Sequence, residues 1–396
     1  MHAQDSDRAA PAAPTTRADQ IVEQRQQKAA TLQPDTPSGL EQKLNRIEND
    51  DLVQRITCQL DGFCVTFGGL IPNAGPSAGP AYVKHGLFDG AATFRSSLSV
   101  STQQFWKAET GLSFPHLASD HFFLDLNAAH RNYPRVDYYG PGPDSQKSGR
   151  TDYSLQDTSL QISPGVRPFA HLRIGALGRY LLTNVGPGRD QEFASTDQVF
   201  TEATTPGLQF QTNFLETGGF AQYDWRDDPG GPRRGGNYYA EYATFTDVER
   251  GGYSFDWVNL DAQQYFSFFN QRRVIALRGR VQAAQPRNGD RVPFYLQPTL
   301  GGPDTLRGFA PFRFYDNASV LLNGEYRWEV FSGLDMALFV DGGQVFDSWR
   351  QINLNDLHAD AGFGFRFNVR NDVFLRLDTG FSREGFQIWL RFGNPF

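Results

Sequence analysis

One stretch of the sequence matches a catalytic motif. Residues 75–79, GPSAG, fit the G-x-S-x-G pattern in which a serine is the nucleophile of a hydrolase. That chemistry needs a strand before the serine, a strained turn at the serine and a helix after it. Here the serine lies in the proline-rich stretch NAGPSAGPA, with no helical pattern following it. We therefore predict no catalytic residue and no enzymatic activity.

Other site chemistries find no support in the residue spacing. Four histidines, at positions 116, 121, 130 and 171, lie in separate segments without the spacing of metal ligands. There is no phosphate-binding loop and no H-E-x-x-H motif. We predict neither a metal nor another cofactor. The net charge of −7 and the lack of a basic stripe also argue against nucleic acid as a partner.

Two pairings remain as candidates for defined side-chain chemistry. Cys58 and Cys64 enclose the short loop QLDGF, and in an oxidising compartment they are predicted to form a local disulfide, because no nearby histidine completes a metal site. The second candidate is Arg307, which lies alone between Leu306 and Gly308 in the loop GGPDTLRGFAPFRFYDN, residues 301–317. A guanidinium that becomes buried needs a carboxylate partner. The segments around this loop must supply that partner.

Those segments read as strands. From Cys64 to Phe396, apolar and polar residues alternate with a period of two. In the last segment, one face carries Phe386, Ile388, Leu390, Phe392 and Phe396. We predict about sixteen strands, near 63–71, 79–89, 91–100, 103–114, 120–139, 152–163, 169–183, 206–226, 237–247, 253–268, 272–284, 318–330, 334–346, 358–369, 373–382 and 385–396.

The strands fit a membrane barrel better than a soluble sandwich. Many run to about 10–13 residues, which matches a tilted membrane-crossing strand, whereas strands of globular sheets have about 5–6. No apolar run is long enough for a membrane-spanning helix. The chain is rich in Phe, Tyr and Trp, and Tyr and Trp near segment ends fit interfacial girdles. We predict an all-β fold, an antiparallel transmembrane β-barrel in a bacterial outer membrane, with membrane lipids as partners.

The barrel is predicted to be preceded by two other regions. Residues 1–19 are rich in Ala, Pro, Asp and Thr and are predicted to be disordered. Residues 20–62 are predicted to be a periplasmic helical segment, because apolar residues recur near helical spacing among charges. This amphipathic segment either packs on its own domain, which we favour, or serves as a partner-binding arm. The barrel itself is assigned to residues 63–396.

Several motifs together resemble one family. The run GGPDTLRGF, 301–309, resembles the loop motif of the outer-membrane assembly barrel superfamily, which includes BamA, TamA and the two-partner secretion transporters, the bacterial surface antigen type of barrel. FVDGG, 339–343, is similar to its F-x-D-x-G motif, and GFGFR, 362–366, to its G-x-G-x-R motif. YDWRDDPGGPRRG, 223–235, is similar to its turn signature, and the terminal Phe396 completes the pattern as an assembly signal. The motif residues are Leu306, Arg307, Gly308, Phe309, Phe339, Asp341, Gly343, Gly362, Gly364 and Arg366.

The resemblance implies that Arg307 contacts Asp341 when the loop folds into the lumen. Side chains alternate between the two faces of a strand, and this alternation places Asp341 and Glu325 on the polar, lumen-facing side. We therefore add Glu325 as a second partner of Arg307. Gly308 would permit close approach of the backbone. Two readings stay open, of equal weight: the pair only braces a loop that plugs the barrel, or it takes part in activity.

The resemblance has a limit that bears on function. Relatives carry periplasmic polypeptide-transport-associated domains, whereas only about 60 residues precede the first strand here. The barrel more closely resembles the one fused to patatin-like lipases, and we expect no lipase domain either. Two functions stay open. The first is an assembly or translocation barrel whose seam between the first and last strands admits an unfolded outer-membrane protein or a lipid, with a separate periplasmic protein as a further partner. The second is a passive, plugged barrel. The pairing of the first and last strands distinguishes them.

Overall fold

The computed structural model describes Ile21, Gln26, Gln27, Cys58 and residues 60–331, 333–348, 351, 356–369 and 372–396. The predicted tail, 1–19, lies outside the described residues, as does nearly all of the predicted helical segment, 20–62. The chain divides into two compact units, 1–45 and 46–396, and the barrel belongs to the second. Within the described residues, no helix combines the length and the apolar character needed to cross a membrane.

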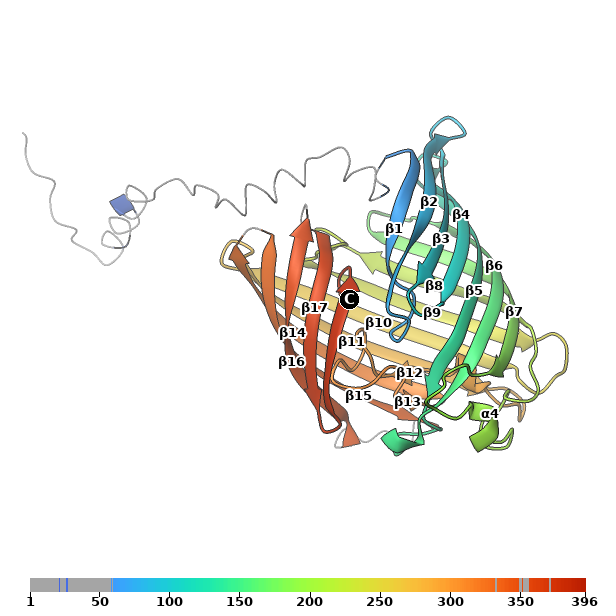
Figure 1. Cartoon of the computed structure of the whole chain (residues 1–396). Helices are drawn as coiled ribbons and strands as arrows, with labels where there is room; N and C mark the ends of the chain where they lie inside the picture. The colour runs from blue at the N-terminus through green and yellow to red at the C-terminus, as the bar shows by residue number, and fades with distance from the viewer. Residues whose placement is uncertain are drawn as a thin grey trace, which may run out of the picture. The chain divides into compact units, whose positions relative to one another are not determined.

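The described part of the barrel unit contains one antiparallel sheet of sixteen strands, each paired with its neighbours along the chain (Figure 1). These strands are β1 (Gly62–Gly69), β2 (Pro76–Leu87), β3 (Ala92–Ser101), β4 (Trp106–Leu117), β5 (Phe122–Tyr138), β6 (Thr151–Val166), β7 (Leu172–Pro187), β8 (Phe214–Asp224), β9 (Gly235–Asp247), β10 (Phe255–Phe268), β11 (Arg273–Pro286), β14 (Ala318–Phe331), β15 (Leu334–Phe346), β16 (His358–Val369), β17 (Asp372–Ser382) and β18 (Gly385–Phe392). The predicted all-β barrel of about sixteen strands is confirmed.

Short elements lie in the connections. The loop between β11 and β14 contains the 3₁₀ helix η2 (Phe294–Leu296) and the two-residue strands β12 (Thr299–Leu300) and β13 (Phe314–Tyr315), which pair with each other. The 3₁₀ helix η1 (Lys147–Gly149) follows β5, and the single-turn helix α4 (Thr196–Val199) follows β7. The segment 301–317 was predicted to be a loop, and apart from β13 it is one.

Most predicted strand limits lie within four residues of the observed ones, and two of the differences have a clear physical reason. The strand predicted at 206–226 begins only at Phe214, because the residues before it form the irregular loop that follows α4. The strand predicted at 385–396 ends at Phe392, because Gly393 has a φ of +81° and turns the chain out of the extended conformation. The strands predicted at 334–346 and 358–369 have the observed limits.

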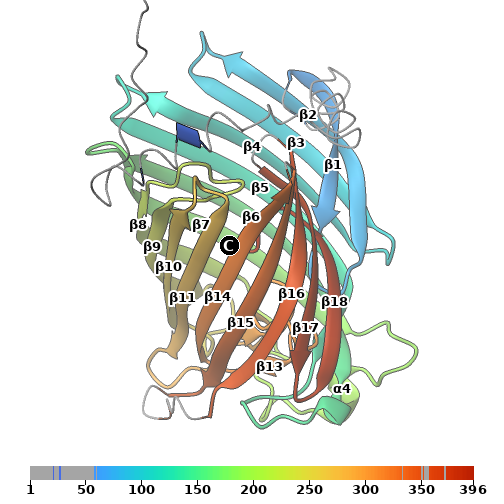
Figure 2. The same cartoon turned by 90° about the vertical axis from the view of Figure 1, so that its left-hand side faces the viewer.

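The two faces of the strands differ as expected for a membrane barrel. Outward side chains such as Leu338 and Val340 on β15 are exposed, whereas the inward Asp341 on the same strand is fully buried. Charges are therefore gathered inside and apolar side chains outside. Figure 2 shows β14–β18 side by side, and the inward faces of β14, β15 and β16 carry half of the predicted site residues.

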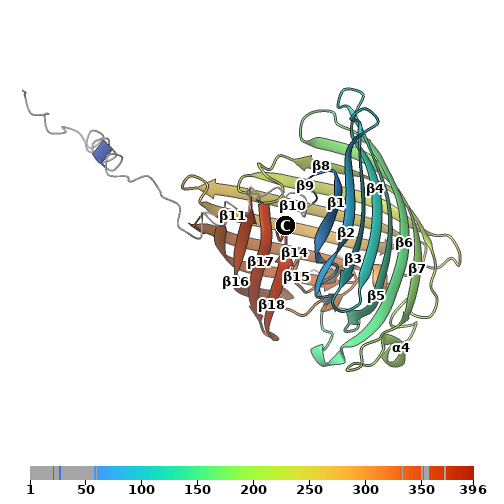
Figure 3. The ribbon, with the colours of Figure 1, turned by 45° about the horizontal axis from the view of Figure 1, so that its top comes forward.

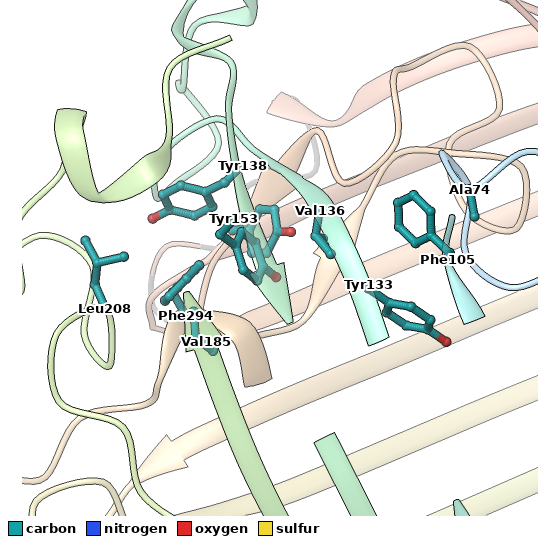
Figure 4. Close-up of a cluster of buried hydrophobic side chains, with 10 residues drawn as sticks. Ala74, Phe105, Tyr133, Val136, Tyr138, Tyr153, Val185, Leu208 and Phe294 are labelled. Carbon is teal, nitrogen blue, oxygen red and sulfur yellow. The ribbon is translucent and has the colours of Figure 1, made fainter. Parts of the chain in front are cut away.

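The two ends of the barrel also differ. Short turns, such as 118–121 and 269–272, join the strands at the end where β1 begins, and long loops such as 139–150 and 287–317 join them at the other. In bacterial barrels the short turns face the periplasm and the long loops face outward. At the long-loop end, called the external end below, the rings of Tyr138 and Phe294 pack edge to face with centroids 5.1 Å apart (Figure 4). The Tyr138 ring packs in the same way on Tyr315, at 4.9 Å. Aromatic side chains fill this end of the barrel.

Candidate functional site

The loop 301–317 lies inside the barrel, beside β14–β17. Leu306 and Phe309 are fully buried in an apolar cluster with Leu300, Leu321 on β14 and Val345 on β15. These side chains hold the two ends of the short LRGF run against the barrel wall. The arginine between them is thereby directed at the charged inward face of the wall.

Arg307 makes a bidentate contact with Asp341 on β15. Its Nε donates to Oδ2 and its Nη2 to Oδ1, each at 2.8 Å, while Nη1 donates to Oε2 of Glu325 on β14 at 2.5 Å. The guanidinium carbon lies 3.5 Å from the centre of the Phe339 ring. All three charged side chains are at most 2% exposed. Such charge-assisted, desolvated contacts are strong and hold the loop in one geometry.

The lock formed by Arg307, Asp341 and Glu325 is part of a longer charge network. Glu325 also accepts hydrogen bonds from Arg327 at 2.7 Å and from Arg366 on β16 at 2.9 Å. Arg366 continues the network to Asp378 on β17, with 2.6 Å between Nη1 and Oδ1. The alternating charges join β14, β15, β16 and β17 across the lumen side of the sheet. Removing one member therefore leaves a buried charge uncompensated.

Glycines permit the close packing of the loop on the wall. A Cβ added at Gly308 would come within 2.6 Å of the Asp360 Cβ, and one added at Gly362 within 2.4 Å of the Phe339 ring. The Phe339 ring thus lies between Gly362 and the Arg307 guanidinium. The two other motif glycines are also confined, since an added Cβ would lie 2.8 Å from the Val320 oxygen at Gly343 and 2.1 Å from an Asp378 oxygen at Gly364.

The loop backbone also contacts the last two strands, which the sequence did not indicate. Trp389 on β18 donates from Nε1 to the Arg307 carbonyl at 2.7 Å, and Ser382 on β17 donates to the Gly308 carbonyl at 2.7 Å. Trp389 is buried and alternates along β18 with the exposed Ile388 and Leu390, so its ring lies on the inward face. Nothing in the sequence linked it to a carbonyl 82 positions away.

The seam lies between β1 and β18. Both strands are fully described, and no ladder of backbone hydrogen bonds joins them, although β1 pairs with β2 and β18 with β17. Figures 1 and 3 show the red β18 beside the blue β1, at the two edges of the sheet. They touch through the Phe67 and Phe392 rings, whose centroids are 6.3 Å apart, and through Arg391, which donates to the Ile71 carbonyl at 3.4 Å.

The chain end does not follow the predicted pattern. Phe396 was placed on the outward face with Phe386 and Ile388, but after Gly393 the chain turns inward and the parity count no longer applies. The Phe396 ring stacks on Tyr265 at 6.3 Å, and the Tyr265 hydroxyl donates to the Phe396 carbonyl at 2.6 Å. Its role as an assembly signal stays a prediction.

The remaining candidate residues take structural positions. Cys58 and Cys64 are joined by a disulfide, with their Cα atoms 5.1 Å apart, next to the start of β1. Ser77 of the GPSAG motif lies within β2, and its hydroxyl donates to the Gly68 carbonyl at 3.0 Å, so it has neither the strained turn nor the helix of a nucleophile elbow. In the part of the chain that the structure describes, no group of three or more His, Cys, Asp or Glu side chains could hold a metal ion.

Comparisons with known proteins agree on the family and the fold. The family model described as Omp85 superfamily domain matches residues 90–379. BamA from Haemophilus ducreyi lacking POTRA domains 1–3 is similar in structure, with a TM-score of 0.62 and 14% identity, over 85% of this chain and 70% of that chain. CdiB from Escherichia coli is similar with a TM-score of 0.53 and 13% identity, over 84% of this chain and 62% of that chain. No curated protein matches the sequence.

Proposed function

Because this chain belongs to the Omp85 superfamily of outer-membrane barrels, we propose that it aids the insertion or transfer of protein or lipid through the seam between β1 and β18. An unfolded outer-membrane protein is the substrate that the seam would suit best. The observation that carries the proposal is the missing ladder between the two strands.

Unpaired strand edges are costly in a membrane. Backbone N–H and C=O groups that face hydrocarbon without partners cost several kcal/mol each, which is why membrane barrels normally close. The outward side chains of β18, among them Phe386, Ile388 and Leu390, are 57–62% exposed, as expected of a strand at membrane depth. An incoming strand that pairs with either edge would satisfy these backbone groups, as in other cases of strand addition to a sheet edge.

A passive, plugged barrel is the second candidate. It is favoured by the loop 301–317, which occupies the lumen beside β14–β17, and by the aromatic rings that fill the external end. In this case the charged lock around Arg307 only braces the wall. Neither feature accounts for the unpaired edges, so we rank this function second.

A reversible cross-link at the seam tests the proposal. The double variant Phe67→Cys/Phe392→Cys places thiols where the two rings meet. In vesicles, we expect the wild-type protein to accelerate the folding of a denatured outer-membrane barrel protein, and the oxidised double variant to lose that acceleration. Fluorescent-lipid flipping, measured in the same vesicles, distinguishes protein transfer from lipid transfer.

The matched control is Ala361→Cys/Phe381→Cys, which links β16 and β17, two strands that already pair at these positions. It should keep full activity when oxidised, and the same reductant applied to both variants accounts for loss of the native disulfide. If the oxidised seam variant accelerates folding as well as the wild type does, the seam has no role. Lack of any acceleration or lipid flipping by the wild-type protein would leave the passive barrel.

A further inference from the structure

We propose that Arg313 is an external latch: it holds the turn between β17 and β18 and thereby keeps the last strand in place at the seam. The inference rests on the proposed function of the seam and deepens it, because it names a residue that would regulate opening. Arg313 lies in the same loop as Arg307, six positions later. No sequence motif pointed to it.

Arg313 joins three segments that are distant in the sequence. Its Nε donates to both carboxylate oxygens of Glu384, at 3.1 and 2.9 Å, in the turn between β17 and β18. Its Nη1 and Nη2 donate to the side chain and the carbonyl of Ser145, at 2.8 and 2.6 Å, in the loop after β5. The guanidinium also lies between the Tyr139 and Phe314 rings, at 4.9 and 4.6 Å from their centres.

Arg313 is enclosed by other side chains to an extent that is unusual for an arginine among surface loops. Its side chain is 3% exposed, although it lies at the external end of the barrel among loops. A long cationic side chain at a loop-rich surface normally keeps its charge in water. Here the planar guanidinium is enclosed by two rings and by acceptors from two separate segments, a geometry that suits arginine and that lysine cannot reproduce.

Other contacts hold the same turn. Lys147 in η1 donates to the Glu384 carbonyl at 2.8 Å. Arg383, next to Glu384, lies 2.9 Å from Nδ1 of His358, whose ring stacks on Phe314 at 3.9 Å. The turn is therefore tied to the loop after β5 and to the loop 301–317, and through them to the external end as a whole.

The position of β18 makes this anchoring consequential. In the described structure β18 has a single strand neighbour, β17, and on its other side the seam contacts are few. Beyond that ladder it is held at Trp389 by the Arg307 carbonyl and at its first turn by Arg313 through Glu384. One loop thus supports the seam strand at Trp389 and at its first turn, and Asp304 of the same loop lies 3.6 Å from Arg391. Displacing the external loops would free the turn while the lumen lock stays formed.

Hydrogen–deuterium exchange in nanodiscs measures the latch directly. In Arg313→Gln and in Glu384→Gln, we expect exchange in peptides covering 376–392 to be faster by about tenfold, the effect of losing a charge-assisted pair. Arg313→Lys should be intermediate, because an ammonium reaches one partner only. The control is Arg150→Gln, which removes a similar arginine that pairs with Asp137 at 3.0 Å and stacks on Phe193 at 4.0 Å.

The outcomes separate the latch from the function of the seam. Faster exchange confined to 376–392, absent in Arg150→Gln, supports the latch. Unchanged exchange there, or a rise spread evenly over β5–β11, overturns it. If Arg313→Gln fails to fold, Glu384→Gln gives the same test with a smaller change. Faster exchange without any folding or lipid-flipping activity in the wild type supports the latch and rejects the proposed function. Activity in the wild type with unchanged exchange in both variants rejects the latch alone.

Discussion

Replacing Arg307 with alanine should strongly destabilise the folded barrel. Among the described residues, Arg307 is the side-chain cation that contacts both Asp341 oxygens. Its removal leaves that fully buried carboxylate with hydrogen bonds from Asn323 and from the loop backbone. Glu325 loses less, because Arg327 and Arg366 still contact it. Breaking a buried pair by removing one partner costs about 3–5 kcal/mol, and full burial argues for this range without a discount for water.

The magnitude is measured by unfolding in denaturant, with the protein in phospholipid vesicles and tryptophan fluorescence as the signal. Protease access to the loop 301–317 should rise in parallel. Arg307→Lys should lower the free energy of unfolding by roughly half as much as Arg307→Ala, because an ammonium cannot make the bidentate contact. The matched control is Arg173→Ala: Arg173 pairs with Asp125 at 2.8 Å, and the two side chains are 34% and 38% exposed, so about 1 kcal/mol or less is expected.

A double-mutant cycle with Asp341→Ala decides whether the two residues interact. Asp341→Ala alone should cost about 2–3 kcal/mol, since Arg307 keeps Glu325 as a partner. The double variant should be no less stable than Arg307→Ala, because neither charge is then left behind. If the stability loss of the double variant equals the sum of the two single losses to within about 0.5 kcal/mol, the two residues act independently, which would refute the lock.

Three further changes test other parts of the structure by the same unfolding measurement or by exchange. Gly308→Ala should cost about 1–3 kcal/mol, because the new methyl group would overlap the Asp360 side chain, and no loss would contradict the observed packing. Burial raises the pKa of Asp316 to about 6, so stability should fall as pH rises from about 4 to 6. Asp316→Asn should remove that fall and be more stable than the wild type at pH 7.5 by about 1–3 kcal/mol. If the variant keeps the wild-type pH profile, Asp316 is not the origin of the pH dependence. Reducing the Cys58–Cys64 disulfide should speed exchange at the start of β1 and leave β14–β16 unchanged, and a general rise would show a wider role.

Alternation and length predicted most of the fold because a membrane strand is constrained on both faces. Its outward face must be apolar and its inward face can hold charges, so a one-residue slip is not tolerated and the pattern is visible in the sequence. β15 and β16 were located to the residue for this reason. The pairing of Arg307 with Asp341 came from a motif, and Glu325 from parity alone.

The errors arose where the backbone leaves the strand conformation. Gly393-Asn394-Pro395 and Pro206-Gly207 are turn signals. The predicted strands 385–396 and 206–226 nevertheless included them. The contacts of Trp389 and Arg313 could not have been predicted, because Trp389 donates to a carbonyl 82 positions away and the two acceptors of Arg313 lie 71 and 168 positions away. Every residue carries a backbone carbonyl, so the residue type does not reveal which carbonyl accepts a hydrogen bond. Such contacts depend on how the loop folds back, which strand periodicity does not determine.

The lengths of the contacts suggest where the barrel can yield. The lock between the loop and β14–β15 is made of fully buried pairs at 2.5–2.8 Å, whereas Arg391 on β18 approaches the Ile71 carbonyl, just after β1, at 3.4 Å. A donor–acceptor distance of 3.4 Å lies beyond the ordinary N–H···O range of about 2.7–3.2 Å, so the contact of Arg391 is the weaker one. In the function proposed above, opening would therefore begin with the separation of β1 from β18, while Arg307 stays bound. Because the loop also holds β18 through Trp389, β1 is the edge that moves first while the external latch is closed.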